Sequence, residues 1–162
     1  PEEALKPKAQ PSIVDPEYLV NRADEAYEKG DYAEALKLLR NAHAKDRKNS
    51  DILNKLGFIL SKEGENDEAI SSYLESLELK NDDDMVHNAI ASVYRNINET
   101  AKAREHYERA LMIDDEYAIT YFNFANLLVD IQEIDEAKVM YDKAILIDPD
   151  FTQAKFEREK LK

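Results

Sequence analysis

The 162-residue sequence contains no cysteine, and none of its apolar stretches approaches the roughly 18 residues that a membrane-spanning helix requires. The absence of cysteine excludes disulfide and thiol chemistry but does not identify a compartment. Residues 1–15 also lack the apolar core of a signal peptide. We therefore expect no insertion into a bilayer and no membrane contact by this fragment.

The sequence also lacks the motifs on which catalysis and metal binding usually depend. It has no glycine-rich phosphate loop, no nucleophile elbow and no Cys/His pairing. The acidic runs at 82–84 and 114–116 are not followed by the glycine that a calcium loop needs. His43, His87 and His106 show no paired spacing on one helix face. We expect no enzymatic activity, no cofactor and no metal site.

Negative charge is abundant, with a formal net charge of -13. It is concentrated in residues 50–117, which hold 16 acids and 7 bases, whereas residues 1–49 hold 10 acids and 9 bases. An acidic surface repels phosphate backbones and anionic headgroups, which excludes nucleic acid as a partner. Most of these acids are expected on solvated faces and at helix starts. The alternative is that they attract a basic partner to the middle of the chain.

Small residues recur every 34 residues in three sets of four. A fixed period of this length is typical of stacked helical repeats, in which small residues allow two helices to cross closely. Large residues recur in the same register, as in the set Leu39, Tyr73, Tyr107 and Tyr141. The period therefore predicts packed helical hairpins. The small sets are Ala23, Gly57, Ala91, Ala125; Ala35, Ala69, Ala103, Ala137; and Ala42, Ser76, Ala110, Ala144.

Local signals place the ends of the helices. Asp15 followed by Pro16 predicts a helix that begins at about residue 16, and Gly30 is expected to end it. Asp31 and Glu34 have the spacing of a capping box for the next helix. Gly64 marks the same turn in the second hairpin, but the third and fourth hairpins carry Asn98 and Gln132 there. Glutamine is the costlier of the two if the turn keeps a left-handed conformation.

The motif Leu53-x2-Leu56-Gly57-x2-Leu60, followed by Ala69-x3-Tyr73, resembles the tetratricopeptide repeat. The resemblance covers residues 16–151 and implies an all-α, right-handed superhelical solenoid of antiparallel hairpins. The chain departs from the family pattern by keeping the closing proline only at Pro149 and by placing Arg22 in a leucine column. The four implied repeats are 16–49, 50–83, 84–117 and 118–151.

The two ends of the chain differ from the repeats. Residues 1–15, with three prolines in the first fourteen positions, are expected to form an extended or disordered linker, and residues 152–162 a solvating cap helix. Because the chain begins with Pro1, we expect a processed or excised piece of a longer protein. The compartment is unknown. We favour the cytoplasm, with a membrane-anchored or periplasmic location if an upstream segment has been removed.

The resemblance implies that the first helix of each hairpin lines a concave groove that binds other proteins. Four of eight positions in two adjacent groove columns are Asn, whereas 11 Asn in 162 residues predict about half of one. An amide side chain pairs with both the C=O and the N–H of a peptide backbone, as asparagine rows do in family members that grip extended peptides. The alternative is that some of these amides bond within a hairpin or face water. The expected partner-binding residues are Asn21, Asn54, Asn88, Asn123, Asn126, Val20, Tyr27, Phe58, Arg95 and Phe122.

Two hypotheses follow from the sequence. The first is a non-catalytic adaptor that holds a peptide segment or helix of a partner in the groove. The partner is not expected to be a chaperone C-terminal carboxylate. The places where the resemblance implies a Lys and Asn clamp hold Val20 and Asp24, or Asn54 and Phe58 if they are counted from the second repeat. The second is a structural module that forms homo-oligomers through repeat end faces. We expect a monomer or a weak homo-oligomer.

Overall fold

The computed structural model describes residues 15–162, which form nine helices and no strand. The helices are α1 (Pro16–Glu28), α2 (Tyr32–Lys45), α3 (Ser50–Lys62), α4 (Asn66–Leu79), α5 (Asp84–Asn96), α6 (Thr100–Ile113), α7 (Ala118–Asp130), α8 (Ile134–Ile147) and α9 (Thr152–Glu159). The linker predicted for residues 1–15 lies outside the described residues except for Asp15. No helix in the described range is long and apolar enough to cross a membrane.

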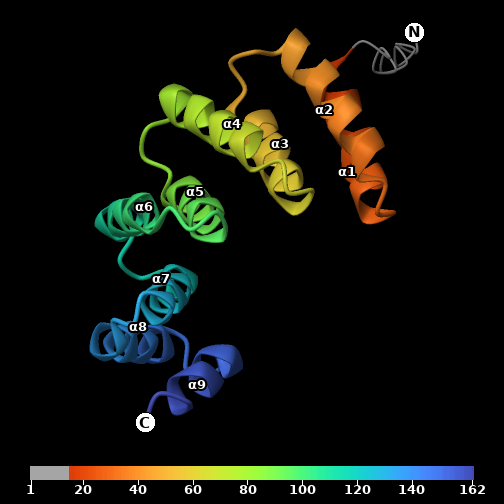
Figure 1. Cartoon of the computed structure of the whole chain (residues 1–162). Helices are drawn as coiled ribbons and strands as arrows, with labels where there is room; N and C mark the ends of the chain where they lie inside the picture. The colour runs from red at the N-terminus through yellow and green to blue at the C-terminus, as the bar shows by residue number, and fades with distance from the viewer. Residues whose placement is uncertain (1–14) are drawn as a thin grey trace, which may run out of the picture.

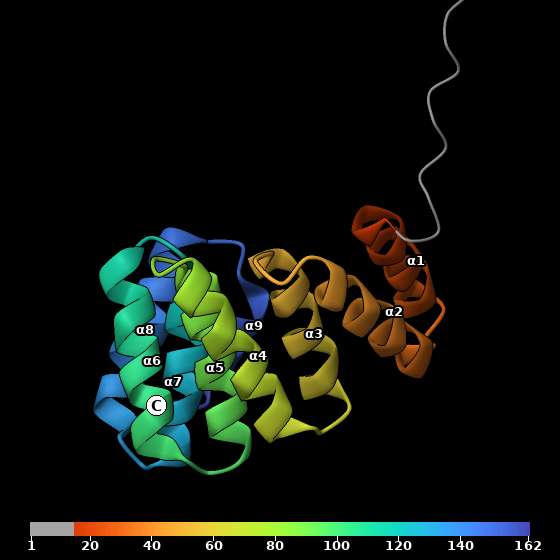
Figure 2. The same cartoon turned by 90° about the horizontal axis from the view of Figure 1, so that it is seen from above.

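The helices form four hairpins stacked into a curved array (Figure 1). The first helices of the hairpins begin at Pro16, Ser50, Asp84 and Ala118, which are 34 residues apart. The first helices of the hairpins, α1, α3, α5 and α7, line the inner side of the arc, and α2, α4, α6 and α8 form its outer layer. Seen from above, α1, α2 and α3 extend to one side, whereas α4 overlaps the later hairpins (Figure 2).

Small side chains lie where the helices of a hairpin cross, as their spacing predicts. Ala35, Ala69, Ala103 and Ala137 have no solvent exposure. A Cβ added at Gly57 would lie 2.8 Å from ring atoms of Tyr73, which is itself buried. A Cβ at this distance would overlap the ring, so glycine lets Tyr73 pack directly on α3 without a shift of either helix.

Side chains cap the N-termini of several helices. The Oδ1 of Asp15 accepts a hydrogen bond from the Glu17 amide at 2.9 Å, and the Oδ1 of Asp31 accepts one from the Glu34 amide at 3.1 Å. Asp83 does the same for Val86 at the start of α5. Each bond satisfies one of the amides that the first helical turn leaves unpaired, which confirms the start expected at residue 16.

All four turns within the hairpins have a residue with positive φ. These are Gly30 at 77°, Gly64 at 78°, Asn98 at 61° and Gln132 at 64°. The left-handed geometry is therefore kept where glycine is replaced. The Cβ of any residue other than glycine raises the energy of this conformation. Gln132 is the less suitable of the two replacements, because it lacks the short polar side chain with which asparagine tolerates it.

We expect Gln132→Gly to raise the free energy of unfolding by about 0.5 kcal/mol. The left-handed region costs a non-glycine residue about 1–2 kcal/mol, and the extra freedom of glycine in the unfolded chain offsets part of the gain. Chemical denaturation of both proteins measures the difference. The control Gln153→Gly, within α9, should lower stability instead. A loss of stability in Gln132→Gly would contradict the assigned strain.

Candidate functional site

The inner helices bring two of the predicted asparagines together. The Nδ2 of Asn123 on α7 donates to the Oδ1 of Asn88 on α5 at 3.3 Å, and both side chains are half-buried. Asn54 on α3 is also half-buried, with its Oδ1 buried and unpaired within the described residues. Asn21 on α1 is exposed and has no side-chain hydrogen bond to the other three among the described contacts. The amide row is therefore linked only between the third and fourth hairpins.

Asn126 has a partner inside its own hairpin. Its Oδ1 accepts a short hydrogen bond from the hydroxyl of Tyr141 on α8. Burial raises the pKa of Tyr141 to about 12, so this hydroxyl remains a donor at neutral pH. Arg95 is likewise engaged, because its guanidinium forms a bidentate ion pair with Asp130 across the third and fourth hairpins. The side-chain hydrogen bond to Asp130 raises the pKa of Arg95.

An aromatic pair joins the first two hairpins on the inner side. The Tyr27 ring lies 5.7 Å from Phe58, and its other neighbour is Tyr32 at 5.4 Å. Phe58 is 45% exposed, and with Tyr27 and Ile59 it lines a pocket of about 130 Å³. Lys55 and Asp24 also line this pocket and form an ion pair, in which the Nζ of Lys55 lies 2.8 Å from the Oδ1 of Asp24.

Phe122 is less accessible than Phe58. Its ring packs 4.8 Å from Phe151, just before α9, and 6.0 Å from Tyr141. Phe151, which follows the last hairpin, thus covers part of Phe122, one of the predicted partner-binding residues.

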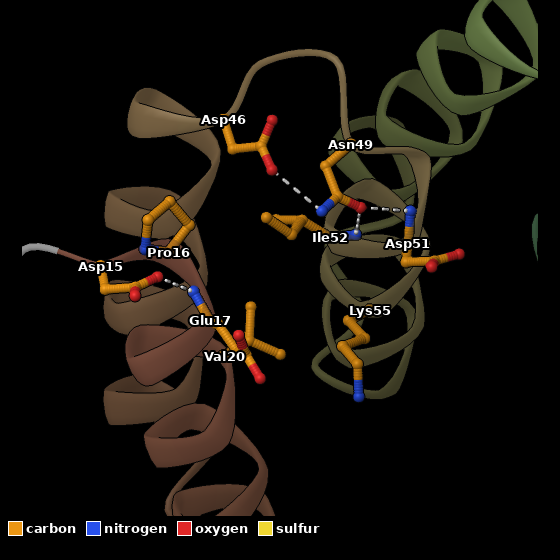
Figure 3. Close-up of a pocket in the computed structure, with 9 residues that line it drawn as sticks. All are labelled: Asp15, Pro16, Glu17, Val20, Asp46, Asn49, Asp51, Ile52 and Lys55. Atoms are coloured by element: carbon orange, nitrogen blue, oxygen red, sulfur yellow. Dashed lines mark hydrogen bonds between the residues drawn. The ribbon is translucent and has the colours of Figure 1, made fainter. Parts of the chain in front are cut away.

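Val20 lies in a larger pocket of about 600 Å³ between the first two hairpins (Figure 3). The pocket is lined by Asp15, Pro16, Glu17, Val20, Asp46, Asn49, Asp51, Ile52 and Lys55. The Oδ1 of Asn49 accepts from the amides of Asp51 and Ile52, and its Nδ2 donates to Asp46. The sequence interpretation did not identify Asp46 or Asn49, although an Asn before a predicted helix start is a signal for a cap.

Two histidines that showed no paired spacing in the sequence face each other across the third hairpin. The Nδ1 of His87 on α5 lies 3.0 Å from the Nδ1 of His106 on α6, and the second ring also stacks on Tyr94. Burial lowers the pKa of His87, and Arg109 adds to the effect. Burial is the main cause that lowers the pKa of His106, and the neighbouring His87 lowers it further. The described residues contain no group of three or more potential metal ligands.

A family model for the tetratricopeptide repeat matches residues 26–93 and 98–155, which is most of the chain. The chain belongs to the tetratricopeptide repeat family. The predicted fold class is confirmed as an all-α repeat solenoid. Proteins of this family generally mediate protein–protein interactions and are generally non-catalytic.

Solved tetratricopeptide repeat structures share this fold. MamA from Desulfovibrio magneticus is 16% identical with a TM-score of 0.81, over 90% of this chain and 82% of that one. YrrB, described as having an unusual peptide-binding site, is 21% identical with a TM-score of 0.78. The match covers 89% of this chain and 74% of YrrB. The first repeat domain of Spaghetti, bound to an HSP90 peptide, is 23% identical with a TM-score of 0.66. The match covers 69% of this chain and 89% of that domain. No curated protein sequence matches the chain.

Proposed function

We propose that this chain is an adaptor that binds a peptide segment or helix of a partner protein along the inner face of its four repeats, 16–49, 50–83, 84–117 and 118–151. The observation that carries the proposal is the contact between Asn88 and Asn123, which holds two amides from successive repeats in line on the inner helices. Each amide retains hydrogen-bonding capacity beyond this one bond. Backbone groups of a partner are suitable ligands for them.

Apolar side chains on the same helices supply a second kind of contact. Phe58, Met85 and Ile119 are exposed on α3, α5 and α7. Exposed aromatic and apolar residues beside polar ones are typical of binding surfaces, where a few anchors contribute most of the affinity. Phe58 is the best-defined anchor, since it lines a pocket with Tyr27.

The ion pair between Asp24 and Lys55 supports a ligand other than a chaperone tail. Asp24 stands where a carboxylate clamp needs a neutral or basic residue, and it neutralises the nearest lysine at 2.8 Å. A free C-terminal carboxylate placed there would meet an anion instead of a donor. We therefore do not propose a peptide like the HSP90 peptide bound to Spaghetti as a ligand of this chain.

The binding test compares matched substitutions against a partner isolated with the wild-type array. We expect Asn88→Ala to weaken binding by about 1 kcal/mol, or roughly fivefold, because it removes one hydrogen bond to the partner. Phe58→Ala should weaken it by about tenfold or more, as an anchor does. Calorimetry measures both affinities.

Asn41→Ala and Phe156→Ala are the controls. Both side chains are exposed but lie on α2 and α9, away from the inner faces of α3 and α5. If the groove variants bind as tightly as their controls, the groove hypothesis is wrong.

Self-assembly through repeat end faces is the alternative. The observation in its favour is Phe156 on the terminal helix α9, which is 58% exposed. The net charge of -13 opposes close association of identical chains. Light scattering across micromolar concentrations separates the two, since a monomer throughout leaves only the adaptor function.

A further inference from the structure

Exposed apolar side chains recur at the C-terminal ends of the outer helices. Met112 on α6 is 86% exposed, and Leu146 on α8 is 81% exposed. They are 34 residues apart and so occupy equivalent positions in the third and fourth hairpins. No other large apolar side chain in residues 15–162 is as exposed as these two. We define the apolar edge as Leu79, Met112, Ile113, Leu146 and Ile147, all of which are exposed.

Packing within the array does not require Met112 or Leu146. Each follows a fully buried alanine, Ala110 or Ala144, by two residues. Two residues turn an α-helix by about 200°, so these side chains point away from the helix crossing. Single exposed apolar residues are ordinary, but repetition at one position of successive hairpins produces a patch.

The apolar edge also has a hollow beside it. Met112 and Ile113 line a pocket of about 360 Å³ together with Asn81, Asp82, His87 and Arg109. The loop between α4 and α5 therefore lies against the end of α6. An apolar side chain inserted here would contact the Met112 and Ile113 side chains while its flanks meet the loop.

Acidic residues predominate around the apolar edge, although Arg109 also lines the hollow beside Met112 and Ile113. The outer helices α4, α6 and α8 end at the edge, and each is followed by a loop that contains acidic residues. Residues 79–84, 112–116 and 146–150 hold eight acids and one base, Lys80. The acids are Asp82, Asp83, Asp84, Asp114, Asp115, Glu116, Asp148 and Asp150.

We propose that the apolar edge is a second interaction surface, separate from the inner groove, and that it binds a basic amphipathic segment of another protein. Apolar side chains of that segment cover Met112 and Leu146, and its Lys and Arg residues lie over the acidic loops. This charge pattern selects the occupant, because anionic lipid, nucleic acid and a second copy of this chain are all repelled. The surface does not depend on the groove having a ligand.

The test uses a fluorescent 14-residue amphipathic peptide of Leu and Lys, with a Leu and Glu peptide of the same pattern as its counterpart. Fluorescence anisotropy measures binding to the full chain. We expect the basic peptide to bind and the acidic one not to bind. The double variant Met112→Ser, Leu146→Ser should lose about tenfold in affinity, as expected when exposed anchors are removed. Raising the salt concentration should also weaken binding, since the flanking contacts are ionic.

The control is Val139→Ser, Phe156→Ser, which removes two exposed apolar side chains that belong neither to the apolar edge nor to the inner groove. It should bind the basic peptide as wild type does. The proposal is overturned if the Met112, Leu146 variant binds within twofold of wild type, or if both variants lose affinity equally. It is also overturned if wild type dimerises and the same variant is monomeric, because a second copy then occupies the edge. Circular dichroism confirms that both variants are folded.

Discussion

Ala103→Leu is expected to destabilise the fold by about 1–3 kcal/mol, because the new side chain has no space at a close helix crossing. Ala103 on α6 is fully buried, and its neighbours in the core include Tyr107 and Phe124. Tyr107 and Phe124 stack with their centroids 5.5 Å apart, so the core cannot yield without moving two rings. Equilibrium unfolding in denaturant measures the loss.

Ala101→Leu is the matched control, since Ala101 lies on the same helix and is exposed. A surface change of this kind should stay within about 0.5 kcal/mol. Equal effects at the two positions would contradict the register in which the 34-residue columns place small residues at crossings.

Acid should destabilise the third hairpin through the contact between His87 and His106. At neutral pH one Nδ1–H donates to the other Nδ1 across 3.0 Å. When both rings are protonated, two N–H groups face each other, the hydrogen bond is lost, and two positive charges repel. A buried polar group left unpaired costs on the order of 1–3 kcal/mol. The acids Asp82, Asp83, Asp84 and Glu105 oppose the effect, and Arg109 adds to it.

The direction of the pH effect follows from the lowered pKa of both rings in the folded state. Between the folded pKa and the unfolded value of about 6.5, the unfolded chain binds more protons. Stability is therefore full above about pH 6.5 and is lost as the pH falls toward the folded pKa. Thermal unfolding at pH 7.5 and 5.5 should show a fall in the midpoint that is smaller in His106→Gln. An equal fall in wild type and His106→Gln would refute the assignment.

Regular spacing and local chemistry were sufficient to predict the array. The helix starts at Pro16, Ser50, Asp84 and Ala118 follow the columns of small residues, because each column must face a crossing in every repeat. The turn at Gln132 kept positive φ without glycine, since the geometry of the hairpin outweighs the preference of one residue. Caps at Asp15 and Asp31 depend on contacts two or three residues away, which sequence patterns show directly.

The partners of the candidate groove residues were not predictable in the same way. The sequence placed Asn88, Asn123 and Asn126 on inner helices. It did not show that Asn88 and Asn123 bond to each other, whereas Asn126 bonds to Tyr141. Helical spacing predicts only approximately the direction in which a side chain points from its helix. A partner on another helix depends on how the two helices are rotated and displaced.

The amino-acid sequence by itself determined the repeat length, the helical hairpins, the buried small residues and the excess of acid, because each depends on residue identity and local spacing. Only the tertiary structure decided that Phe122 lies against Phe151, that His87 meets His106, and that Asp24 neutralises Lys55. These contacts join residues 19 to 31 positions apart. Their geometry depends on how hairpin stacks on hairpin, which no single helix pattern contains.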